Sequence, residues 1–90
     1  MRILIIDDDV QIREGITEGI DWASLGIEEV RNCGDGATGL AIYEEFRPDI
    51  ILADVRMPEM DGLEFLQRVR ETDESVKVIM ISGSSDFVYI

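Results

Sequence analysis

The stretch RILIIDDD at residues 2–9 places an apolar run directly before three aspartates. Two later stretches repeat this pattern: IILAD at residues 50–54 ends in Asp54, and VKVIMIS at residues 76–82 ends in Ser82. Near-continuous apolar runs of this length are typical of strands buried on both faces of a parallel sheet. Such sheets bind their ligands beyond the carboxyl ends of the strands. We therefore expect several aspartates and a hydroxyl group to converge at one edge of a sheet.

The composition fits one small domain with an acidic surface. The chain has 90 residues, of which 46% are hydrophobic, and 20 acidic against 8 basic residues give a formal net charge of −12. This length predicts a single domain over residues 1–90. A chain this acidic repels phosphate backbones, so we expect no direct nucleic-acid binding by this segment. No apolar run matches a signal sequence or a membrane span, which predicts a cytoplasmic location without a membrane partner.

The order of the predicted elements is β-α-β-α-β-α-β. Helices are expected at about 10–20, 37–47 and 63–71, and the remaining strand at 27–33. Right-handed crossovers place the second strand on one side of the first and the third on the other, which gives the order 2-1-3-4. The predicted fold is a doubly wound α/β parallel sheet with helices on both of its faces.

Two helix faces can be predicted from the spacing of small and apolar residues. In the first helix, Gly15 and Gly19 lie beside an isoleucine stripe and are expected to allow close approach to the sheet. In the third helix, Leu63, Leu66 and Val69 are expected to face the core.

The last residues predict the start of a further helix. Residues 83–85 form a turn, and Ser85 or Asp86 is expected to cap a helix that the sequence continues for only a few residues. The fourth strand would then be an uncovered, apolar sheet edge. We therefore expect that the chain is the front part of a larger domain or that a partner, such as a second copy in a homodimer, covers this edge.

The strand order brings Asp7 and Asp8 beside Asp54. Two like charges about 4 Å apart cost roughly 4 kcal/mol at an effective dielectric constant near 20, so a cation or a proton should join the three carboxylates. Oxygen ligands without histidine or thiolate favour Mg²⁺. Such a site supports phosphoryl transfer to a carboxylate, and the hydroxyl of Ser82 can donate to a phosphoryl oxygen. Asp9 is expected to cap the first helix.

Three motifs together resemble the CheY-like receiver domain of bacterial two-component response regulators. They read IIDDD at residues 5–9, ILADVRMPEMDG at residues 51–62 and VIMISG at residues 78–83, and they keep the order and spacing of that family. The resemblance implies a flavodoxin-like fold of five parallel strands ordered 2-1-3-4-5. It also implies that Gly62 supplies a permissive turn after the second motif.

The resemblance implies a role for each residue of the acidic edge. Asp54 would be the phosphoacceptor, and it would also contact Mg²⁺. Asp8 would ligate Mg²⁺ directly, and Asp7 would hold a metal-bound water. The backbone carbonyl of Arg56 would be a further metal ligand. Ser82 would be the hydroxyl that moves toward the phosphoryl group.

The resemblance also implies partners. A sensor histidine kinase would supply the phosphoryl group, and phosphorylation would switch an output domain of the same protein. Residues 13–15, 20–22 and 82–87 resemble a subgroup whose receivers precede an AraC-type DNA-binding domain. On this interpretation the chain is a signalling switch rather than an enzyme.

One departure from the family pattern is large. Receivers carry a lysine at the end of a fifth strand, whereas the single lysine here, Lys77, begins the fourth strand. We interpret this difference as truncation, with the last helix, strand and helix of a receiver absent from the given chain.

Two alternatives remain open from the sequence. Asp7 and Asp9 form an Asp-x-Asp pair after an apolar strand, as in haloacid-dehalogenase-type phosphatases, where they would act as nucleophile and acid/base. The other alternative is a pseudo-receiver, an interaction module that is never phosphorylated.

Overall fold

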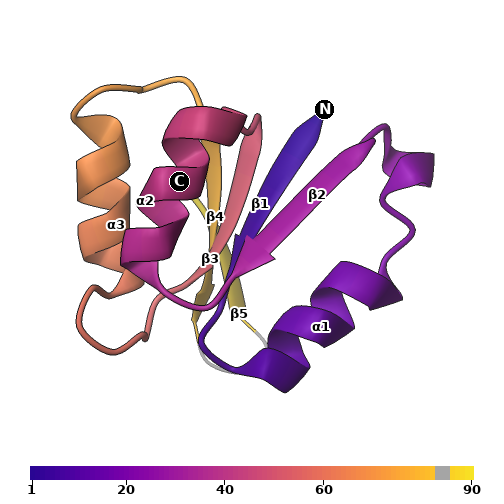
Figure 1. Cartoon of the computed structure of the whole chain (residues 1–90), viewed down its shortest axis with the longest axis horizontal. Helices are drawn as coiled ribbons and strands as arrows, with labels where there is room; N and C mark the ends of the chain where they lie inside the picture. Colours follow the sequence, from indigo (N-terminus) through magenta and orange to yellow (C-terminus); the bar gives the residue numbers. More distant parts are fainter. Residues whose placement is uncertain (83–85) are drawn as a thin grey trace.

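A computed structural model of the chain, which describes residues 1–82 and 86–90, shows a five-stranded sheet flanked by helices (Figure 1). The strands lie in the order β2-β1-β3-β4-β5, so the predicted order 2-1-3-4 is confirmed. The strands are β1 (Arg2–Ile6), β2 (Glu29–Cys33), β3 (Ile50–Asp54), β4 (Lys77–Ser82) and β5 (Asp86–Tyr89), and the helices are α1 (Val10–Gly19), the 3-10 turn η1 (Ala23–Leu25), α2 (Gly36–Phe46) and α3 (Gly62–Arg70).

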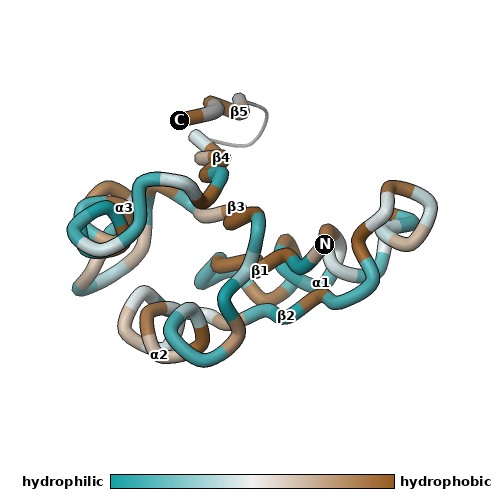
Figure 2. The backbone as a smooth tube through the Cα atoms, turned by 90° about the horizontal axis from the view of Figure 1, so that it is seen from above, coloured by the Kyte–Doolittle hydropathy of each residue, from teal (hydrophilic) through white to brown (hydrophobic). Residues whose placement is uncertain are grey.

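Alternate residues of the central strands face two separate apolar layers. Leu4 and Ile6 of β1 pack with the layer that contains α2 and α3, whereas Ile3 and Ile5 pack with the layer that contains α1. Figure 2, which views the backbone from above, shows α2 and α3 on one side of the sheet and α1 on the other. The apolar run of β1 is therefore continuous because both of its faces are buried.

Each α-helix begins at an aspartate that caps it. The carboxylates of Asp9, Asp35 and Asp61 accept hydrogen bonds from backbone N–H groups in the first turns of α1, α2 and α3. These bonds satisfy donors that would otherwise lack partners. Within the described residues, no helix combines the length and apolar character needed to cross a bilayer.

One prediction about a helix face is wrong, and a second is wrong for one of its three residues. A Cβ atom at Gly15 or Gly19 would meet nothing within 4 Å, so these glycines do not bring α1 close to the sheet. In α3, Val69 is buried and Leu66 packs against the core as predicted, but Leu63 is 52% exposed and Phe65 is fully buried in its place. The inner face of α3 differs from the predicted one because the ring of Phe65, rather than the side chain of Leu63, occupies the space against α2.

The predicted helix after β4 is also wrong for the residues that the structure describes. Asp86 belongs to β5, which pairs antiparallel with β4 in the register Ser82 with Asp86 and Ile79 with Tyr89. Ser85 lies outside the described residues. A strand forms because the edge of β4 offers unpaired backbone groups, and the aromatic and β-branched residues that follow suit a strand. Since β5 covers this edge, the reason for expecting a homodimer there no longer holds.

Gly62 is needed for close packing and not for an unusual backbone conformation. A Cβ atom there would lie 2.9 Å from the Cα atom of Val55 and would collide with the carbonyl oxygen of Asp54. The residue of this loop with positive φ is Glu59, at 67°. The permissive turn expected at Gly62 is therefore wrong, and the glycine instead lets α3 begin directly against the end of β3.

Asp73 ties the start of β4 to α2. Its carboxylate accepts hydrogen bonds from the hydroxyl of Tyr43 at 2.7 Å and from the hydroxyl and backbone N–H of Ser75 at 2.7 and 2.8 Å. These bonds, those from Ser75 first, lower the pKa of Asp73 well below its usual range.

We expect Gly62→Ala to lower the free energy of unfolding by about 3 kcal/mol or more, because the added methyl group meets backbone atoms that cannot move aside. Gly15→Ala is the matched control. It adds the same group in open space on a helix and should raise the free energy of unfolding by roughly 0.5–1 kcal/mol. Urea unfolding followed by circular dichroism measures both changes, and equal values for the two variants would contradict the packing described for Gly62.

We expect Asp73→Asn to lower the melting temperature at neutral pH and to have a smaller effect in acid. A carboxyl group whose pKa is lowered in the folded state contributes stability above its unfolded pKa, and that stability disappears as the pH falls. The difference in melting temperature between wild type and Asp73→Asn should therefore shrink from pH 7 to pH 3. Tyr43→Phe removes one of the hydrogen bonds and should show a smaller effect with the same sign.

Candidate metal centre

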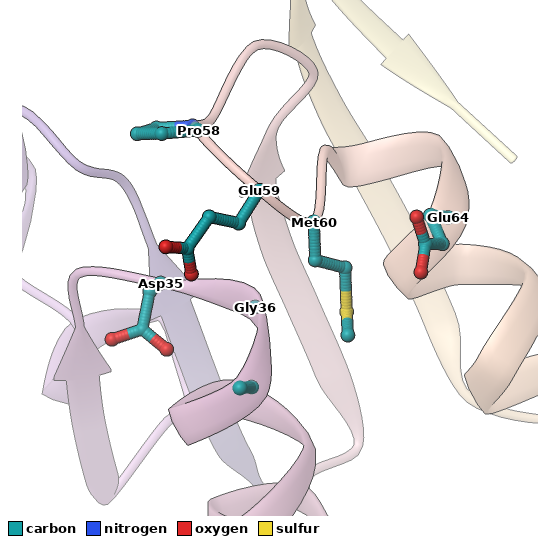
Figure 3. Close-up of a pocket in the computed structure, with 7 residues that line it drawn as sticks. Asp35, Gly36, Pro58, Glu59, Met60 and Glu64 are labelled. Carbon is teal, nitrogen blue, oxygen red and sulfur yellow. The ribbon is translucent and has the colours of Figure 1, made fainter.

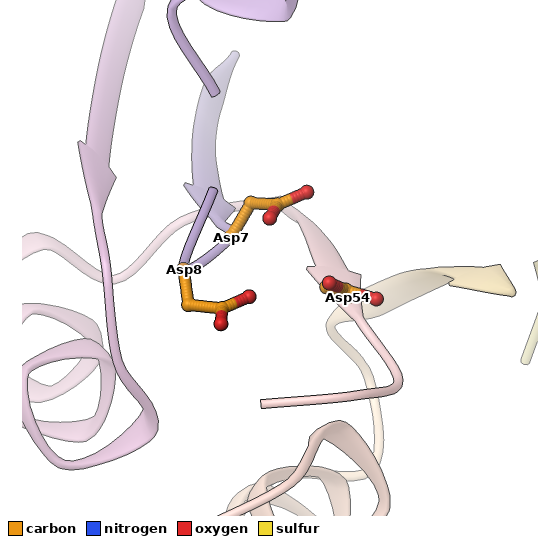
Figure 4. Close-up of side chains that lie close together, drawn as sticks. All are labelled: Asp7, Asp8 and Asp54. Atoms are coloured by element: carbon orange, nitrogen blue, oxygen red, sulfur yellow. The ribbon is translucent and has the colours of Figure 1, made fainter. Parts of the chain in front are cut away.

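Three carboxylates meet where β1 and β3 end. Ile6 of β1 pairs in register with Ala53 of β3, so the chains leave adjacent strands at the same level with Asp7 and Asp54. Asp7, Asp8 and Asp54 each offer an oxygen atom, and these atoms lie within 4.8 Å of one another. Figure 4 shows the three side chains gathered at the ends of the two strands. The predicted convergence of these aspartates is therefore present in the structure.

Asp7 is the most constrained member of the cluster. Its side chain is 1% exposed, and its Oδ1 atom accepts a hydrogen bond of 2.9 Å from the backbone N–H of Asp9. Burial raises the pKa of Asp7, and the negative charges of Asp54 and Asp8 raise it further against the effect of that hydrogen bond. Asp8 is exposed and Asp54 is half-buried, so solvent reaches the cluster on their side.

The donor set fits a hard divalent cation. All three side chains supply carboxylate oxygens, and the cluster contains no histidine nitrogen or thiolate sulfur. A buried carboxylate beside two others is unfavourable when all are charged, and a cation removes that repulsion. Mg²⁺ prefers oxygen ligands and uses one or two carboxylates while it keeps further positions for water or phosphate oxygens. The residues present therefore fit Mg²⁺.

Backbone hydrogen bonds fix the position of Asp54. The N–H of Arg56 donates to Asp54 Oδ1 at 3.2 Å, and the N–H of Val55 donates to the carbonyl of Ile81 in β4 at 3.1 Å. The N–H of Gly62 donates to the carbonyl of Val55 at 2.9 Å. The end of β3 is thus held by its own loop, by β4 and by the start of α3.

The other predicted site residues lie around this cluster. Ser82 is exposed at the end of β4, one residue beyond Ile81, which is the register partner of Asp54. Arg56 is exposed in the loop two residues after Asp54. Lys77 begins β4, at the end of the strand opposite to Ser82. The carboxylate of Asp9 caps α1, as predicted. Because this carboxylate is bound to backbone N–H groups of the helix, its acid/base role in a haloacid-dehalogenase-type phosphatase has no support.

Arg13 is a residue near the site that sequence reasoning missed. Its guanidinium group donates to the backbone carbonyl of Asp7 at 2.8 Å and to Oδ1 of Asn32 at 3.0 Å. The sequence did contain a signal for Arg13, because a residue four positions after the helix cap at Asp9 lies on the same side of the helix as that cap. The contact with Asn32 could not be read from the sequence, because it joins α1 to β2.

A second acidic surface lies between the start of α2 and the loop before α3. Figure 3 shows this pocket with side chains from both segments. Two of its three carboxylates have structural partners: Asp35 caps α2, and Glu64 pairs with Arg68 at 3.1 Å, whereas Glu59 is exposed in the loop before α3. The pocket therefore does not compete with the cluster at the strand ends as a candidate site.

Comparison with known proteins places the chain in a family. The model of the response regulator receiver domain matches residues 3–90. A curated relative, an uncharacterized transcriptional regulatory protein YesN of Bacillus subtilis, is 37% identical over 91 residues, which is 98% of this chain and 24% of that protein. The chain spans about a quarter to a third of the length of curated relatives that it matches.

Solved structures give the same result. A two-component transcriptional regulator AraC from Clostridium phytofermentans is 36% identical, with a TM-score of 0.86 over 96% of this chain and 69% of that one. The receiver domain of the histidine kinase CKI1 from Arabidopsis thaliana, solved with Mg²⁺ and BeF₃⁻, is 28% identical, with a TM-score of 0.76 over 94% of this chain and 67% of that one. Since the family model also covers nearly all of the sequence, the chain belongs to the response regulator receiver domain family.

Proposed function

We propose that this receiver domain is a phosphoaccepting switch and that Asp54 is the residue that accepts the phosphoryl group. The observation that supports this most is the half-buried carboxylate of Asp54 at a strand end, with the oxygens of Asp7 and Asp8 within 4.8 Å. Asp8 is exposed, so a donor can approach from that side. The buried Asp7 is better placed to hold a cation than to meet a donor.

The reaction follows from the chemistry of these groups. An oxygen of Asp54 attacks the phosphorus atom of a phosphohistidine in a sensor kinase. A P–O bond forms, the P–N bond breaks, and the imidazole leaves with the electron pair and takes up a proton from solvent. Mg²⁺ at this cluster, held by Asp8 and Asp54 and by the backbone carbonyl of Arg56, with Asp7 holding a metal-bound water, would neutralise charge on the group being transferred. The chain's part is to hold Asp54 in place for attack.

Phosphorylation then changes the balance between two packings of the domain. The hydroxyl of Ser82, at the end of the neighbouring strand, donates to a phosphoryl oxygen. This draws the end of β4 toward Asp54 and favours the conformation in which that contact is made. The readout is a changed affinity for an output domain.

The partners follow from the family. The kinase docks to the receiver, and an output domain of the same protein responds to it. Because YesN and the AraC regulator are transcriptional regulators, we propose a DNA-binding output domain, with the receiver itself making no contact with nucleic acid. The receiver is a switch that modifies only itself, and we place it in the cytoplasm, where such a kinase would act.

The alternative is a pseudo-receiver that folds and binds partners without being phosphorylated. Lys77 lies at the end of β4 away from the cluster, so this lysine does not distinguish the two proposals. The carboxylate cluster favours phosphorylation. The two proposals differ in covalent chemistry, so mass spectrometry separates them.

We expect acetyl phosphate with Mg²⁺ to add the mass of one phosphoryl group to the chain. The addition should disappear in Asp54→Asn and after chelation of Mg²⁺, and it should persist in Glu44→Gln, which makes the same change of charge on the exposed face of α2. Intact mass measurement reads out each case. An unmodified wild type would support the pseudo-receiver, and a modified Asp54→Asn would show that another residue accepts the group.

We expect Mg²⁺ to raise the melting temperature. At a concentration tenfold above its dissociation constant, the ion adds about 1.4 kcal/mol of stability. In a domain of this size that corresponds to a shift of roughly 5–10 °C. Differential scanning calorimetry measures it, and no shift at millimolar Mg²⁺ would contradict the metal centre.

We expect Asp54→Ala to raise the stability of the metal-free protein by about 1–3 kcal/mol. The range follows from Coulomb repulsion between carboxylates about 5 Å apart at effective dielectric constants between about 80 and 20. The same variant should show a smaller stabilisation by Mg²⁺ than wild type. Glu44→Gln should change neither quantity, because its charge is remote from the cluster, and a matching gain there would point to net charge as the cause.

A further inference from the structure

The side chain of Arg13 joins three elements at the edge of the metal centre. It begins in α1, one turn after the cap at Asp9, and Nη1 donates to the backbone carbonyl of Asp7 at 2.8 Å. Its Nε atom donates to Oδ1 of Asn32 at 3.0 Å, near the end of β2. The guanidinium group thus connects the helix, the loop after β1 and the neighbouring strand.

The atom that Arg13 contacts belongs to the peptide that links Asp7 to Asp8. The other polar groups of Asp7 also have partners: its N–H donates to the carbonyl of Cys33 at 3.2 Å, and its carboxylate accepts from Asp9. The side chain of Asp8 is exposed. Its direction therefore depends on how the preceding peptide is oriented, and the bond from Arg13 holds that peptide.

We infer that Arg13 is a positioning residue for the metal centre, holding the Asp7–Asp8 peptide so that both carboxylates face Asp54. The inference rests on the proposed magnesium site. Within residues 1–82 and 86–90, none of the ion pairs involves Arg13, so it acts on the loop through a carbonyl oxygen and not by neutralising a carboxylate. Residues that orient metal ligands in this way typically change metal affinity by about 10–100-fold when they are replaced.

The sign of the change separates positioning from simple electrostatics. Arg13→Met keeps an apolar stem but removes a positive charge near the site. If the charge alone mattered, its loss would strengthen binding of a divalent cation. If Arg13 positions the loop, its loss weakens Mg²⁺ binding by about 10–100-fold. We expect weakening.

Gly34 offers a second test that keeps the arginine. A Cβ atom at this position would lie 2.9 Å from Nη1 of Arg13, at the free end of a flexible side chain, and φ at this glycine is not positive. Gly34→Ala should therefore leave the fold intact and push the guanidinium group away from the Asp7 carbonyl. It preserves every charge, so a loss of Mg²⁺ affinity in this variant can only come from displacement.

The experiment measures Mg²⁺ binding to the chain by isothermal titration calorimetry, with circular dichroism to establish that each variant is folded. The variants are Arg13→Met, Arg13→Lys, Gly34→Ala and Arg68→Met, the last of which makes the same change of charge on the exposed side of α3. We expect weaker binding for Arg13→Met and Gly34→Ala, partial recovery for Arg13→Lys, and no change for Arg68→Met. Saturating Mg²⁺ should restore most of the phosphorylation by acetyl phosphate in Arg13→Met.

The outcomes distinguish this inference from the proposed function. If wild type binds no Mg²⁺, both are wrong. If wild type binds Mg²⁺ and is phosphorylated while Arg13→Met and Gly34→Ala bind as tightly or more tightly, the inference about Arg13 is overturned and the proposed function stands. Weaker binding by Arg13→Met alone, with Gly34→Ala unchanged, would also overturn it, because displacement of the side chain would then have no effect.

Discussion

The carboxylates of Asp7, Asp8 and Asp54 repel one another, and the parallel pairing of β1 with β3 holds them together against that repulsion. Ile6 and Ala53 are register partners, and both are fully buried, so neither strand can slide to relieve the charge. The apolar layers on both faces of the sheet supply the energy for this arrangement. The site is therefore a product of the core: the same burial that stabilises the sheet raises the pKa of Asp7 and favours a cation there.

Much of the fold could be predicted because the signals were local. The apolar runs that became β1, β3 and β4, and Asp9, which caps α1, lie in continuous stretches of sequence. The faces of the helices were harder, because they depend on what lies opposite. Phe65 rather than Leu63 fills the core, since the space between α2, α3 and the sheet decides the matter and the periodicity of one helix does not. The antiparallel strand β5 was missed for a similar reason, because the open edge of β4 selects it.

The candidate site also combines features that the sequence predicts with features that only the structure shows. The three aspartates could be predicted to meet, because strand order and the position of the carboxyl ends follow from general rules. The contact of Arg13 with Asn32 and the fit of Gly34 around the guanidinium group could not, because they depend on the distance between α1 and β2. Gly62 illustrates the difference well. The sequence suggests a permissive turn at this glycine, whereas the structure shows a close approach to the backbone at the end of β3.

Because β5 pairs antiparallel with β4, different parts of the sheet can form at different stages of folding. Ser82 and Asp86 lie four residues apart, whereas Ile3 of β1 must find Ile50 of β3 across about half of the chain. Closing a short loop costs less chain entropy than closing a long one, so β4 and β5 can join and part on their own while the central strands associate as one cooperative unit. Amide protons of β5 would then exchange with solvent by local opening, and those of β1 and β3 only when the whole domain unfolds. The edge strand β5 and the central strands of the same sheet thus belong to different levels of kinetic protection.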